Sequence, residues 1–493
     1  MKKLFVLLLV LIPSLTYAQI KREREIAFMH FLDKEYSESF KEYSRLAQFG
    51  NSEDLESLAQ HYHYGYGTER DINLAIMYYK MAANKGEELS QAQLCEFYSN
   101  GIATATEQQK RDLYKYSRMF SSNLHYSSST NSTDDNARYS LYLCYKNGWG
   151  THKNPLLADI WLTFAACNDA MKAQDEFCSI YGLDGNYNTD EEETALMHYY
   201  IQHLYEKIQP YIQNDKSVEA TYFKIFYLFS QKTQSSALEG IKETISLYDD
   251  NKLDNEGKAF LYDIIAPIAK LDENLKNRYE KDAEKYELVS DEDKNTWHHV
   301  QLTKVVWKID VMLNKSYTQT GIINGHNWVD LGLPSGTKWA TCNIDADNPY
   351  ASGSFYAWAE TRKKREYTPE NYNADSNNMI LNGNNDVAHL FYGTGWSVPS
   401  CEDWRELLLY CDIEYNEQRN AIYVKSPNGQ FIVLPMTQNS EMDGIAYWTN
   451  TRIPGLHDPQ EGSAAALILE TQPDWGIIFA DIWRGCLIRP VLK

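Results

Sequence analysis

The spacing of apolar residues changes near residue 326 of this 493-residue chain. Before that point, apolar side chains recur at intervals of three and four residues, which is typical of helices that bury one face. After it, short apolar runs are separated by Gly, Pro and Asn, which is typical of strands joined by tight turns. The stretch Trp328–Asn343, WVDLGLPSGTKWATCN, lies at the transition. We therefore expect a multidomain chain with an all-α first part and an α+β, strand-rich second part.

The helical part contains an internal repeat, which becomes visible when the sequence is shifted against itself. A shift of 83 residues superposes Gly65 on Gly148, Gly67 on Gly150, Asp71 on Asn154, Ala75 on Ala158, Tyr78 on Trp161, and Ala82-Ala83 on Ala165-Ala166. A shift of 36 residues superposes Gly50 on Gly86 and Gly65 on Gly101. Agreement at so many positions without a gap indicates a repeated structural unit.

Each repeat is predicted to be a helical hairpin. Residues 58–62 supply one apolar helix face, and the two glycines that follow permit a tight turn. Asp71 is placed to cap the second helix, and Gly86 to end it. Alanines and aromatic residues alternate on the packing side of that helix, so we assign Tyr78 and Trp161 to the core.

These residues resemble Sel1-like repeats, which are relatives of the tetratricopeptide repeat, over roughly residues 36–182. The resemblance is strongest at Leu58–Gly86 and Tyr142–Asp169. The unit between them lacks a second glycine after Gly101, and its polar tract Ser121–Asn136 is predicted to be an exposed loop. The resemblance implies a helical-repeat solenoid that binds other proteins.

Residues 189–317 keep the helical spacing without a clean repeat. Acidic residues at Glu191–Glu193 indicate a helix start. Polar breaks separate the predicted helices at Gln213–Lys216, Gln231–Ser236 and Asp249–Gly257. Two interpretations are open, namely divergent repeats that extend the array and a separate helical domain.

The second part is predicted to consist of short strands with one clear helix. Ser400 is placed as the N-cap of that helix, with Asp403 three residues later, and Trp404 and Leu407 on its apolar face. The predicted strands are Trp328–Leu331, Lys338–Cys342, Phe355–Ala359, Ile422–Val424, Phe431–Pro435, Tyr447–Thr449, Ala465–Leu469, Ile477–Phe479 and Leu487–Val491.

Several short motifs are spread along this part. They are Val329–Ala340 followed by Cys342-Asn343, Tyr356-Ala357-Trp358 with Glu360-Thr361, Gly395-Trp396 with Pro399, Trp404 and Leu407, Leu434-Pro435, Tyr447-Trp448, and Arg489-Pro490-Val491. Together they resemble the family called the Fibrobacter succinogenes major paralogous domain, although Ser397 stands where that family usually has Arg. The resemblance implies a C-type-lectin-like fold, and it makes Cys342 and Cys411 the pair expected to form a disulfide.

The lectin-like fold implies two chemistries that the residues can be tested against. A formylglycine-generating oxidase needs paired cysteines near its C-terminus, but only Cys486 lies there. A calcium-dependent lectin needs clustered carboxylates and amides, and Gln472-Pro473-Asp474 spells a triplet found in some lectins. The triplet also fits a hairpin turn, which is the interpretation we prefer. The many Trp and Tyr residues fit a core better than a sugar-stacking surface.

No catalytic, cofactor or metal site is predicted, and the ligand-binding residues are unknown. The eight cysteines form no C-x-x-C pair, so the sequence supports neither a zinc ribbon nor a thioredoxin-type site. For each of them a buried free thiol and a disulfide are both open. Trp297-His298-His299 has no third ligand at suitable spacing. The G-x-S-x-G, H-E-x-x-H and phosphate-loop motifs are absent from the sequence.

Net charge and the N-terminus bear on partner and location. The formal charge of −21 repels phosphate backbones, so we do not expect nucleic acid as a partner. Residues Met1–Gln19 have the basic start, apolar run and small residues of a secretory signal peptide, with cleavage predicted after Ala18. We therefore expect an exported protein, periplasmic or at the cell surface, without membrane insertion after cleavage.

The predicted organisation is a signal peptide at residues 1–18, Sel1-like repeats at 19–188, a helical region at 189–320 and the terminal module at 325–493. The predicted function is that of a non-enzymatic scaffold for protein–protein interaction that needs no cofactor. The alternative is a carbohydrate-binding protein that acts through the terminal module, with a glycan as its partner.

Overall fold

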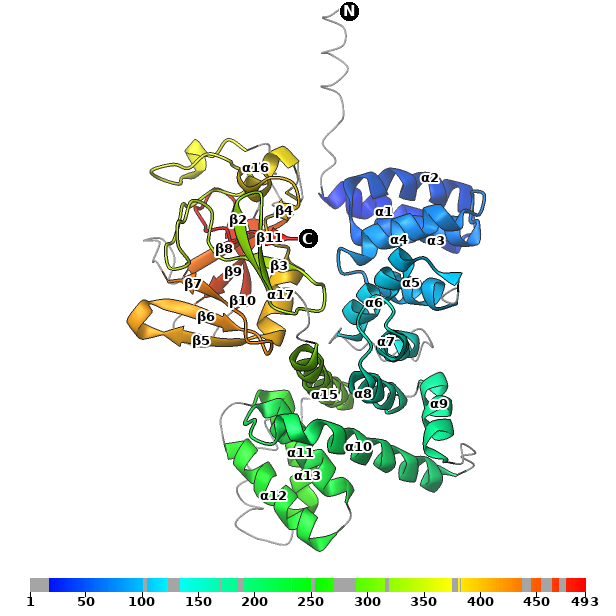
Figure 1. Ribbon diagram of the computed structural model, residues 1–493. Helices are drawn as coiled ribbons and strands as arrows, with labels where there is room; N and C mark the ends of the chain where they lie inside the picture. Colours follow the sequence, from blue (N-terminus) through cyan, green and yellow to red (C-terminus); the bar gives the residue numbers. More distant parts are fainter. Residues whose placement is uncertain are drawn as a thin grey trace, which may run out of the picture. The chain divides into compact units, whose positions relative to one another are not determined.

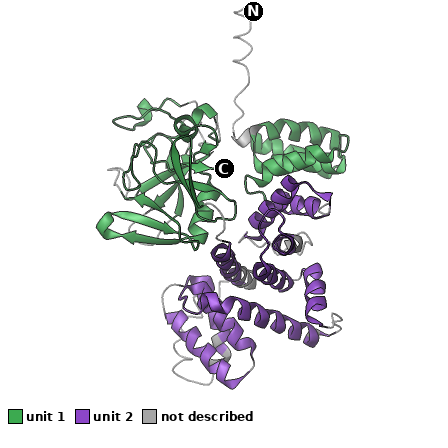
Figure 2. Ribbon diagram, viewed as in Figure 1, with its two compact units in different colours: residues 1–87, 316–493 green, residues 88–315 purple. Residues whose placement is uncertain are grey.

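The computed structural model describes most of the chain in two compact units (Figure 2). The first unit comprises residues 1–87 and 316–493, and the second comprises residues 88–315. The described residues are 17–100, 104–122, 134–168, 170–183, 189–231, 233–249, 253–269, 290–314, 319–374, 380–381, 383–436, 445–453, 463–469 and 476–493. The predicted signal peptide lies outside them up to residue 16, and the predicted cleavage point after Ala18 falls in the first turn of the first described helix.

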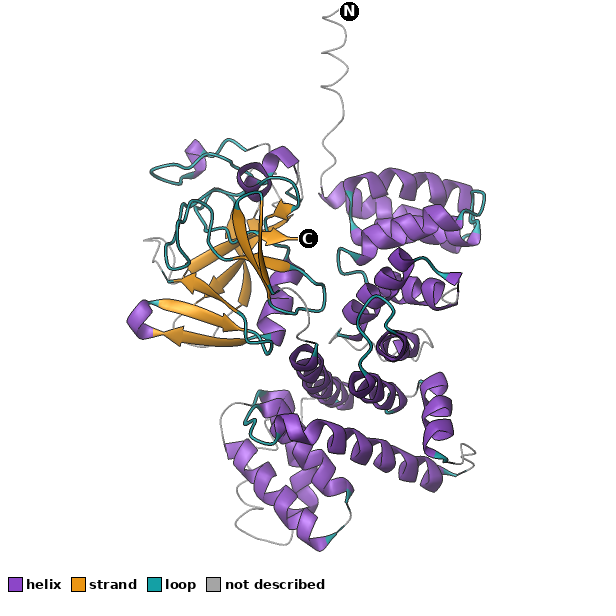
Figure 3. Cartoon of the chain, in the orientation of Figure 1, coloured by secondary structure: helices purple, strands orange, loops and turns teal. Residues whose placement is uncertain are grey.

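Up to Leu313 the described secondary structure is helical (Figures 1 and 3), which confirms the all-α prediction for this part. The first unit holds α1 (Tyr17–Leu32), α2 (Tyr36–Leu46), the short 3-10 turn η1 (Ala47–Phe49), α3 (Ser52–Tyr64) and α4 (Ile72–Ala83). The second unit holds α5 (Glu88–Asn100), α6 (Glu107–Ser121), α7 (Asp134–Asn147), α8 (Pro155–Ala166), α9 (Met171–Tyr181), α10 (Asp190–Ile212), α11 (Val218–Ser230), α12 (Gln234–Asp249), α13 (Asn255–Ala269) and α15 (Asp291–Leu313). None of the described helices has the length and apolarity needed to cross a bilayer.

The repeat hairpins form through the local signals that the sequence predicts. Gly65 ends α3 in the left-handed conformation, with φ at +76°. The Asp71 carboxylate then accepts hydrogen bonds from the backbone N–H groups of Asn73 and Leu74, at 2.9 and 3.0 Å, and so caps α4. Asn154 caps α8 in the same way. The predicted turn and caps are therefore confirmed in both repeats.

The second glycine of each turn has a role beyond the turn itself. A Cβ atom on Gly67 would lie 2.1 Å from the backbone oxygen of Tyr36, at the start of α2. A Cβ atom on Gly150 would lie 2.6 Å from the backbone oxygen of Lys110, in α6. Successive hairpins thus meet backbone to backbone at this position, which only glycine permits.

Alanine at Gly67 is expected to destabilise the array more than alanine at Gly65. Both glycines have positive φ, but a Cβ on Gly65 meets its nearest atom at 3.5 Å, which is ordinary contact. We expect Gly65→Ala to cost about 1 kcal/mol of unfolding free energy and Gly67→Ala about 2–3 kcal/mol. Thermal unfolding of the two variants of the full chain measures the difference, and equal losses would contradict the backbone contact.

The middle unit is a hairpin despite its missing glycine. Thr106 and Gln109 form a capping box at the start of α6, and Leu94 and Leu113 are buried on α5 and α6. Both ends of the loop predicted at Ser121–Asn136 are helical, because Ser121 belongs to α6 and α7 begins at Asp134. Residues 123–133 lie outside the described residues.

The helices after residue 189 follow the predicted polar breaks. Thr189 caps α10 by accepting a hydrogen bond from the Glu192 N–H at 3.2 Å. The breaks at residues 213–216 and 231–236 separate α10 from α11 and α11 from α12, although α12 already begins at Gln234. A buried cluster that includes Tyr222, Leu261 and Trp297 then holds α11, α13 and α15 together.

The described residues of the terminal module form three antiparallel sheets (Figure 3), which confirms the strand-rich prediction in its coarse form. The sheets have the orders β1-β2-β3-β11-β4, β10-β9-β8 and β5-β6-β7. The strands are β1 (Thr320–Ile323), β2 (His326–Asp330), β3 (Lys338–Ala340), β4 (Trp396–Ser397), β5 (Asp412–Asn416), β6 (Ala421–Lys425), β7 (Phe431–Pro435), β8 (Ile445–Ile453), β9 (Ser463–Leu469), β10 (Gly476–Asp481) and β11 (Val491–Leu492). The helices are α16 (Val387–Tyr392) and α17 (Cys401–Tyr410), and the single 3-10 turns are η3 (Pro369–Asn371), η4 (Gly383–Asn385) and η5 (Glu417–Arg419).

Seven of the predicted strands of the module are present, as β2, β3, β6, β7, β8, β9 and β10, and two predictions are wrong. The strand predicted at Leu487–Val491 begins only at Val491 in β11, and Leu487 forms an isolated bridge with Tyr447. Phe355–Ala359 is not a strand, because only Tyr356 forms a bridge there, with Cys486. The helix predicted after Ser400 is α17, and its capping box is formed by Ser400 and Asp403. The sequence missed β1, β4, β5 and α16, whose short lengths or polar composition hide them.

Tryptophan dominates the interior of the module. The fully buried ones, each at most 1% exposed, are Trp339, Trp358, Trp396, Trp404 and Trp448. The ring centroids of Trp339 and Trp404 lie 4.6 Å apart in one of the two core clusters. These rings are core, as the sequence predicted, and they are not a sugar-binding surface. Trp475 lies outside the described residues.

Candidate binding surfaces

A buried polar cluster joins the repeats to α15 within the second unit. Asp310 on α15 is 0% exposed. Its carboxylate accepts hydrogen bonds from the Tyr145 hydroxyl, at 2.7 and 2.9 Å, and from the Trp161 indole N–H, at 2.6 Å. One turn further on, the Asn314 amide donates to the hydroxyls of Tyr114 and Tyr145, at 2.7 and 3.2 Å. Side chains from α6, α7 and α8 therefore converge on one helix that follows them by about 150 residues.

Electrostatics at this cluster favour a fixed contact. Burial raises the pKa of Asp310, and the Arg118 guanidinium opposes that rise. The same guanidinium lies over the Trp307 ring of α15, 4.6 Å from its centroid. Burial next to Asp310 also raises the pKa of the Tyr145 hydroxyl. A carboxyl with donors from α7 and α8, and with the Arg118 charge of α6 nearby, is a tether that holds α15 in place, and it offers no open site for a substrate.

The packing of α15 covers one face of the repeat helix α8, so that face is not open to a partner. The helix α15 packs beside α8 (Figure 1). It lies on the face of α8 that carries Trp161. Trp161 is core, as predicted, and its partner is a helix outside the repeats. The sequence signal for Asp310 was a lone acidic residue in the apolar run Val305–Leu313.

Apolar side chains are exposed instead on α1, in the first unit. Phe28, Met29 and Leu32 are 51%, 54% and 55% exposed. They lie at positions i, i+1 and i+4 of one helix, so they share a face. Adjacent exposed apolar side chains often mark sites of protein–protein contact. This apolar face is therefore a candidate contact surface.

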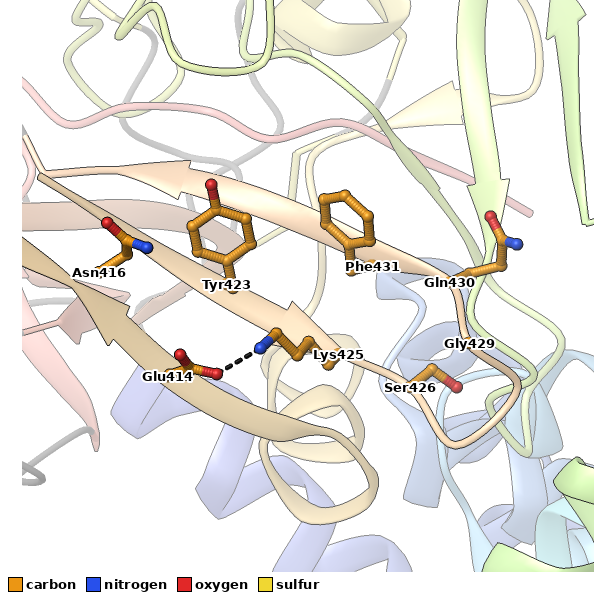
Figure 4. Close-up of a pocket in the computed structure, with 8 residues that line it drawn as sticks. All are labelled: Glu414, Asn416, Tyr423, Lys425, Ser426, Gly429, Gln430 and Phe431. Carbon is orange, nitrogen blue, oxygen red and sulfur yellow. Dashed lines mark hydrogen bonds and ion pairs between the residues drawn. The ribbon is translucent and has the colours of Figure 1, made fainter. Parts of the chain in front are cut away.

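A pocket lies on the solvent side of the β5-β6-β7 sheet in the terminal module (Figure 4). Its volume is about 470 Å³, within the usual range for small-ligand sites. Its lining residues are Glu414, Asn416, Tyr423, Lys425, Ser426, Gly429, Gln430 and Phe431. Sequence reasoning missed it, because Phe431–Pro435 is an unbroken apolar run that does not reveal which side chains face solvent.

The eight cysteines are free thiols in the structure. Cys342 is half-buried in the loop after β3, and Cys411 is buried at the end of α17, so the bridge implied for this pair is not formed. Cys486 is also fully buried, and burial raises the pKa of its thiol. A thiol in that state is a poor nucleophile.

Alkylation is expected to separate the two thiols of the implied pair. Iodoacetamide should modify Cys342 in the native full chain, whereas Cys411 should react only after denaturation because burial raises its pKa and shields it. Peptide mass spectrometry under non-reducing conditions reads both. A linked peptide containing Cys342 and Cys411 would show the disulfide instead.

His298 of α15 is held by packing against aromatic rings. His298 is hydrogen-bonded to the Tyr222 hydroxyl, and burial lowers its pKa to about 4. The side chain of His299 and the Gln472-Pro473-Asp474 triplet lie outside the described residues. Within the described part of the chain, no group of three His, Cys, Asp or Glu side chains is placed to hold a metal ion.

Comparison with known proteins identifies the repeats. The family model described as Sel1 repeat matches residues 55–87 and 136–169, which are α3–α4 and α7–α8. The chain thus carries Sel1 repeats at the two places where the overlaid glycines and alanines lie. The middle unit, α5–α6, falls outside the match although it has the same hairpin form.

Two solved structures are similar to parts of the chain. A Sel1 repeat protein from Oxalobacter formigenes is 14% identical, with 48% of this chain and 90% of that chain covered, at a TM-score of 0.29. The protein c5321, a protective antigen of uropathogenic Escherichia coli strains with an SLR fold, is 15% identical, with 62% and 65% covered, at a TM-score of 0.28. The search of curated proteins gave no match.

Proposed function

We propose that this protein is an exported, non-enzymatic scaffold that holds a protein partner through its Sel1 repeats. The observation that carries the proposal is the pair of Sel1 repeats, since such repeats typically mediate protein–protein interaction. Export is supported by the secretory pattern of Met1–Gln19. The absence of catalytic motifs from the sequence supports a binding role.

The partner would dock on the apolar face of α1 formed by Phe28, Met29 and Leu32, in the helix pair that precedes the first matched repeat. Burial of three half-exposed apolar side chains supplies an anchor of the kind found at the centre of protein interfaces. The face that carries Trp161 is a poorer choice, because Asp310 and its donors already hold α15 there. We therefore expect a partner that presents an apolar surface of its own.

Crosslinking in the native cells tests this function. The tagged full chain is crosslinked, purified and analysed by mass spectrometry beside the double variant Phe28→Ser, Leu32→Ser. The control is Leu238→Ser on α12, which removes an apolar side chain of similar exposure, 53%, from another surface. We expect one partner with the wild type and the control, and about tenfold less with the double variant. Recovery of no specific partner, or equal recovery from all three proteins, would remove the proposal.

Carbohydrate binding through the terminal module is the second candidate function. The resemblance to the Fibrobacter succinogenes major paralogous domain and to C-type-lectin-like folds supports it through the motifs Val329–Ala340 and Arg489–Val491. The specific observation in its favour is the aromatic pocket on the β5-β6-β7 sheet. In this second function the module would bind a glycan, in addition to the protein partner of the repeats.

A further inference from the structure

Strand register places two different faces on the β5-β6-β7 sheet. Ile413, Ile422 and Val424 pack on one side in the core of the module. Glu414 is paired with Tyr423, and Lys425 with Phe431, on the opposite side. Because successive residues of a strand point to opposite faces, Glu414, Tyr423, Lys425 and Phe431 share the face on which the pocket lies. Phe431 lies on that face and is not part of the core cluster, so packing of the core does not explain its aromatic ring.

Two aromatic rings form the centre of this face. The ring centroids of Tyr423 and Phe431 lie 5.8 Å apart with their planes inclined by 36°, and Phe431 is 50% exposed. Figure 4 shows both rings on the same side of the sheet, above neighbouring strands. The Tyr423 hydroxyl is hydrogen-bonded to that of Tyr350 at 2.9 Å, which fixes the direction of its ring. The result is an aromatic platform in which Phe431 faces solvent and the Lys425 ammonium lies over the Tyr423 ring, 5.8 Å from its centroid.

Polar groups border the platform without giving it a net charge. Glu414 and Lys425 form an ion pair across the strands, so the one carboxylate and the one ammonium of the pocket cancel. The Asn416 and Gln430 amides lie at the two ends of the pocket (Figure 4). Gln430 is itself held by a hydrogen bond from its Nε2 to Gln319 Oε1, at 2.8 Å. The pocket thus combines aromatic faces with donors and acceptors.

We propose that this pocket binds a neutral oligosaccharide without a metal ion, through stacking on Tyr423 and Phe431. The inference names the site and the ligand class of the second candidate function and rests on it. A pyranose ring has C–H groups on its faces and hydroxyls on its edge, which match aromatic rings bordered by an ion pair and amides. A calcium ion would need several carboxylate or carbonyl oxygens, and the pocket supplies one carboxylate that is already paired.

A glycan array with the full chain tests the proposal in the presence of excess EDTA. The array carries neutral oligomers of glucose, mannose, galactose, xylose and N-acetylglucosamine, together with sialylated and uronic acid oligosaccharides. The strongest neutral tetrasaccharide is then titrated by calorimetry into the wild type and into Tyr423→Ala, Phe431→Ala and Tyr423→Phe. The control is Phe479→Ala, because Phe479 on β10 is a 59% exposed phenylalanine outside the pocket. Far-UV circular dichroism and thermal unfolding confirm that each variant is folded.

We expect binding to a neutral member in EDTA, with affinity lowered about tenfold by each alanine variant. Tyr423→Phe keeps its ring and should keep most of the affinity, and Phe479→Ala should bind as the wild type does. If both alanine variants still bind, the ligand does not bind at this pocket, and carbohydrate binding by the module stands without it. If the array shows no binding to neutral glycans, the proposed site and the second candidate function are both refuted. A preference for acidic glycans, or loss of binding in EDTA, would refute a neutral ligand bound without a metal ion. None of these outcomes bears on the protein partner of the repeats.

Discussion

Asp310→Ala is expected to lower the unfolding free energy of the second unit by about 3–5 kcal/mol. The carboxylate is fully buried and accepts from Tyr145 and Trp161. Its removal leaves a buried hydroxyl and a buried indole N–H without their acceptor, and it also leaves a cavity. Hydrogen exchange followed by mass spectrometry on the full chain reads the loss at α15 and at its neighbours α7 and α8. Unchanged protection of those helices would contradict the tether.

Asp310→Asn is the matched control for that experiment. The amide keeps the shape of the side chain and one acceptor oxygen, so we expect a loss of only about 1–2 kcal/mol. Gly65→Ala supplies a second reference, because its expected effect is confined to the first unit. A loss in Asp310→Asn equal to that in Asp310→Ala would assign the effect to the charge alone.

The pH dependence of stability follows from the raised pKa of Asp310. Because burial raises this pKa above its value in the unfolded chain, the folded state holds the proton to higher pH than the unfolded state does. The stability of the second unit should therefore fall as pH rises between the ordinary carboxyl pKa and the raised one. Asp310→Asn should remove that component of the slope, which thermal unfolding at a series of pH values measures.

Arg489→Met is expected to destabilise the terminal module by about 3–4 kcal/mol. The Arg489 side chain is 0% exposed, and burial lowers its pKa. Its guanidinium donates to Asn343 Oδ1 at 2.8 Å and to the backbone oxygens of Ala340 and Val433 at 3.1 and 2.5 Å. Methionine has a similar length but cannot donate, so these acceptors would stay buried and unsatisfied. Replacement of a buried ion by an apolar residue is often harmless, but here two of the three acceptors are backbone oxygens, which remain buried in the variant.

Limited proteolysis of the full chain measures the effect on the pocket. Val433 lies on β7, so the loss of its bond to Arg489 should expose the β5-β6-β7 sheet to cleavage before the helical part is cut. Arg489→Lys is the control, because lysine keeps the charge but has fewer hydrogen-bond donors. Its rate of cleavage should lie between those of the wild type and the methionine variant. A methionine variant that resists protease as the wild type does would contradict the role assigned to Arg489. The Arg489 side chain would then not be needed for the stability of the β5-β6-β7 sheet.

Both buried groups connect structure to the proposed function. Asp310 holds α15 on the repeat face that carries Trp161, and this directs a protein partner to other surfaces such as α1. Arg489 holds β7, whose first residue, Phe431, is one of the two rings of the proposed saccharide platform. Neither group touches a ligand in these proposals, and each acts by fixing an element that would.

The sequence by itself determined the features that depend on neighbouring residues. Hairpin turns, the Asp71 and Ser400 caps and the polar breaks of the helical region are decided within a few residues, so their signals are local. The repeat was also readable, because like residues recur at a constant interval in the hairpins that the Sel1 model matches. Short polar strands such as β5 were missed because their pairing partners, and not their composition, make them strands.

Only the tertiary structure decided what depends on residues far apart in the chain. Tyr145 and Asp310 are 165 positions apart, and Val433 and Arg489 are 56 positions apart, so no spacing rule connects them. The same holds for Gly67, whose need for glycine comes from the backbone of Tyr36 on another hairpin. The saccharide platform likewise depends on strand register, since a shift of one residue would exchange Tyr423 with a core side chain. Local interactions set the elements, and long-range packing chose which of their side chains remain available for binding.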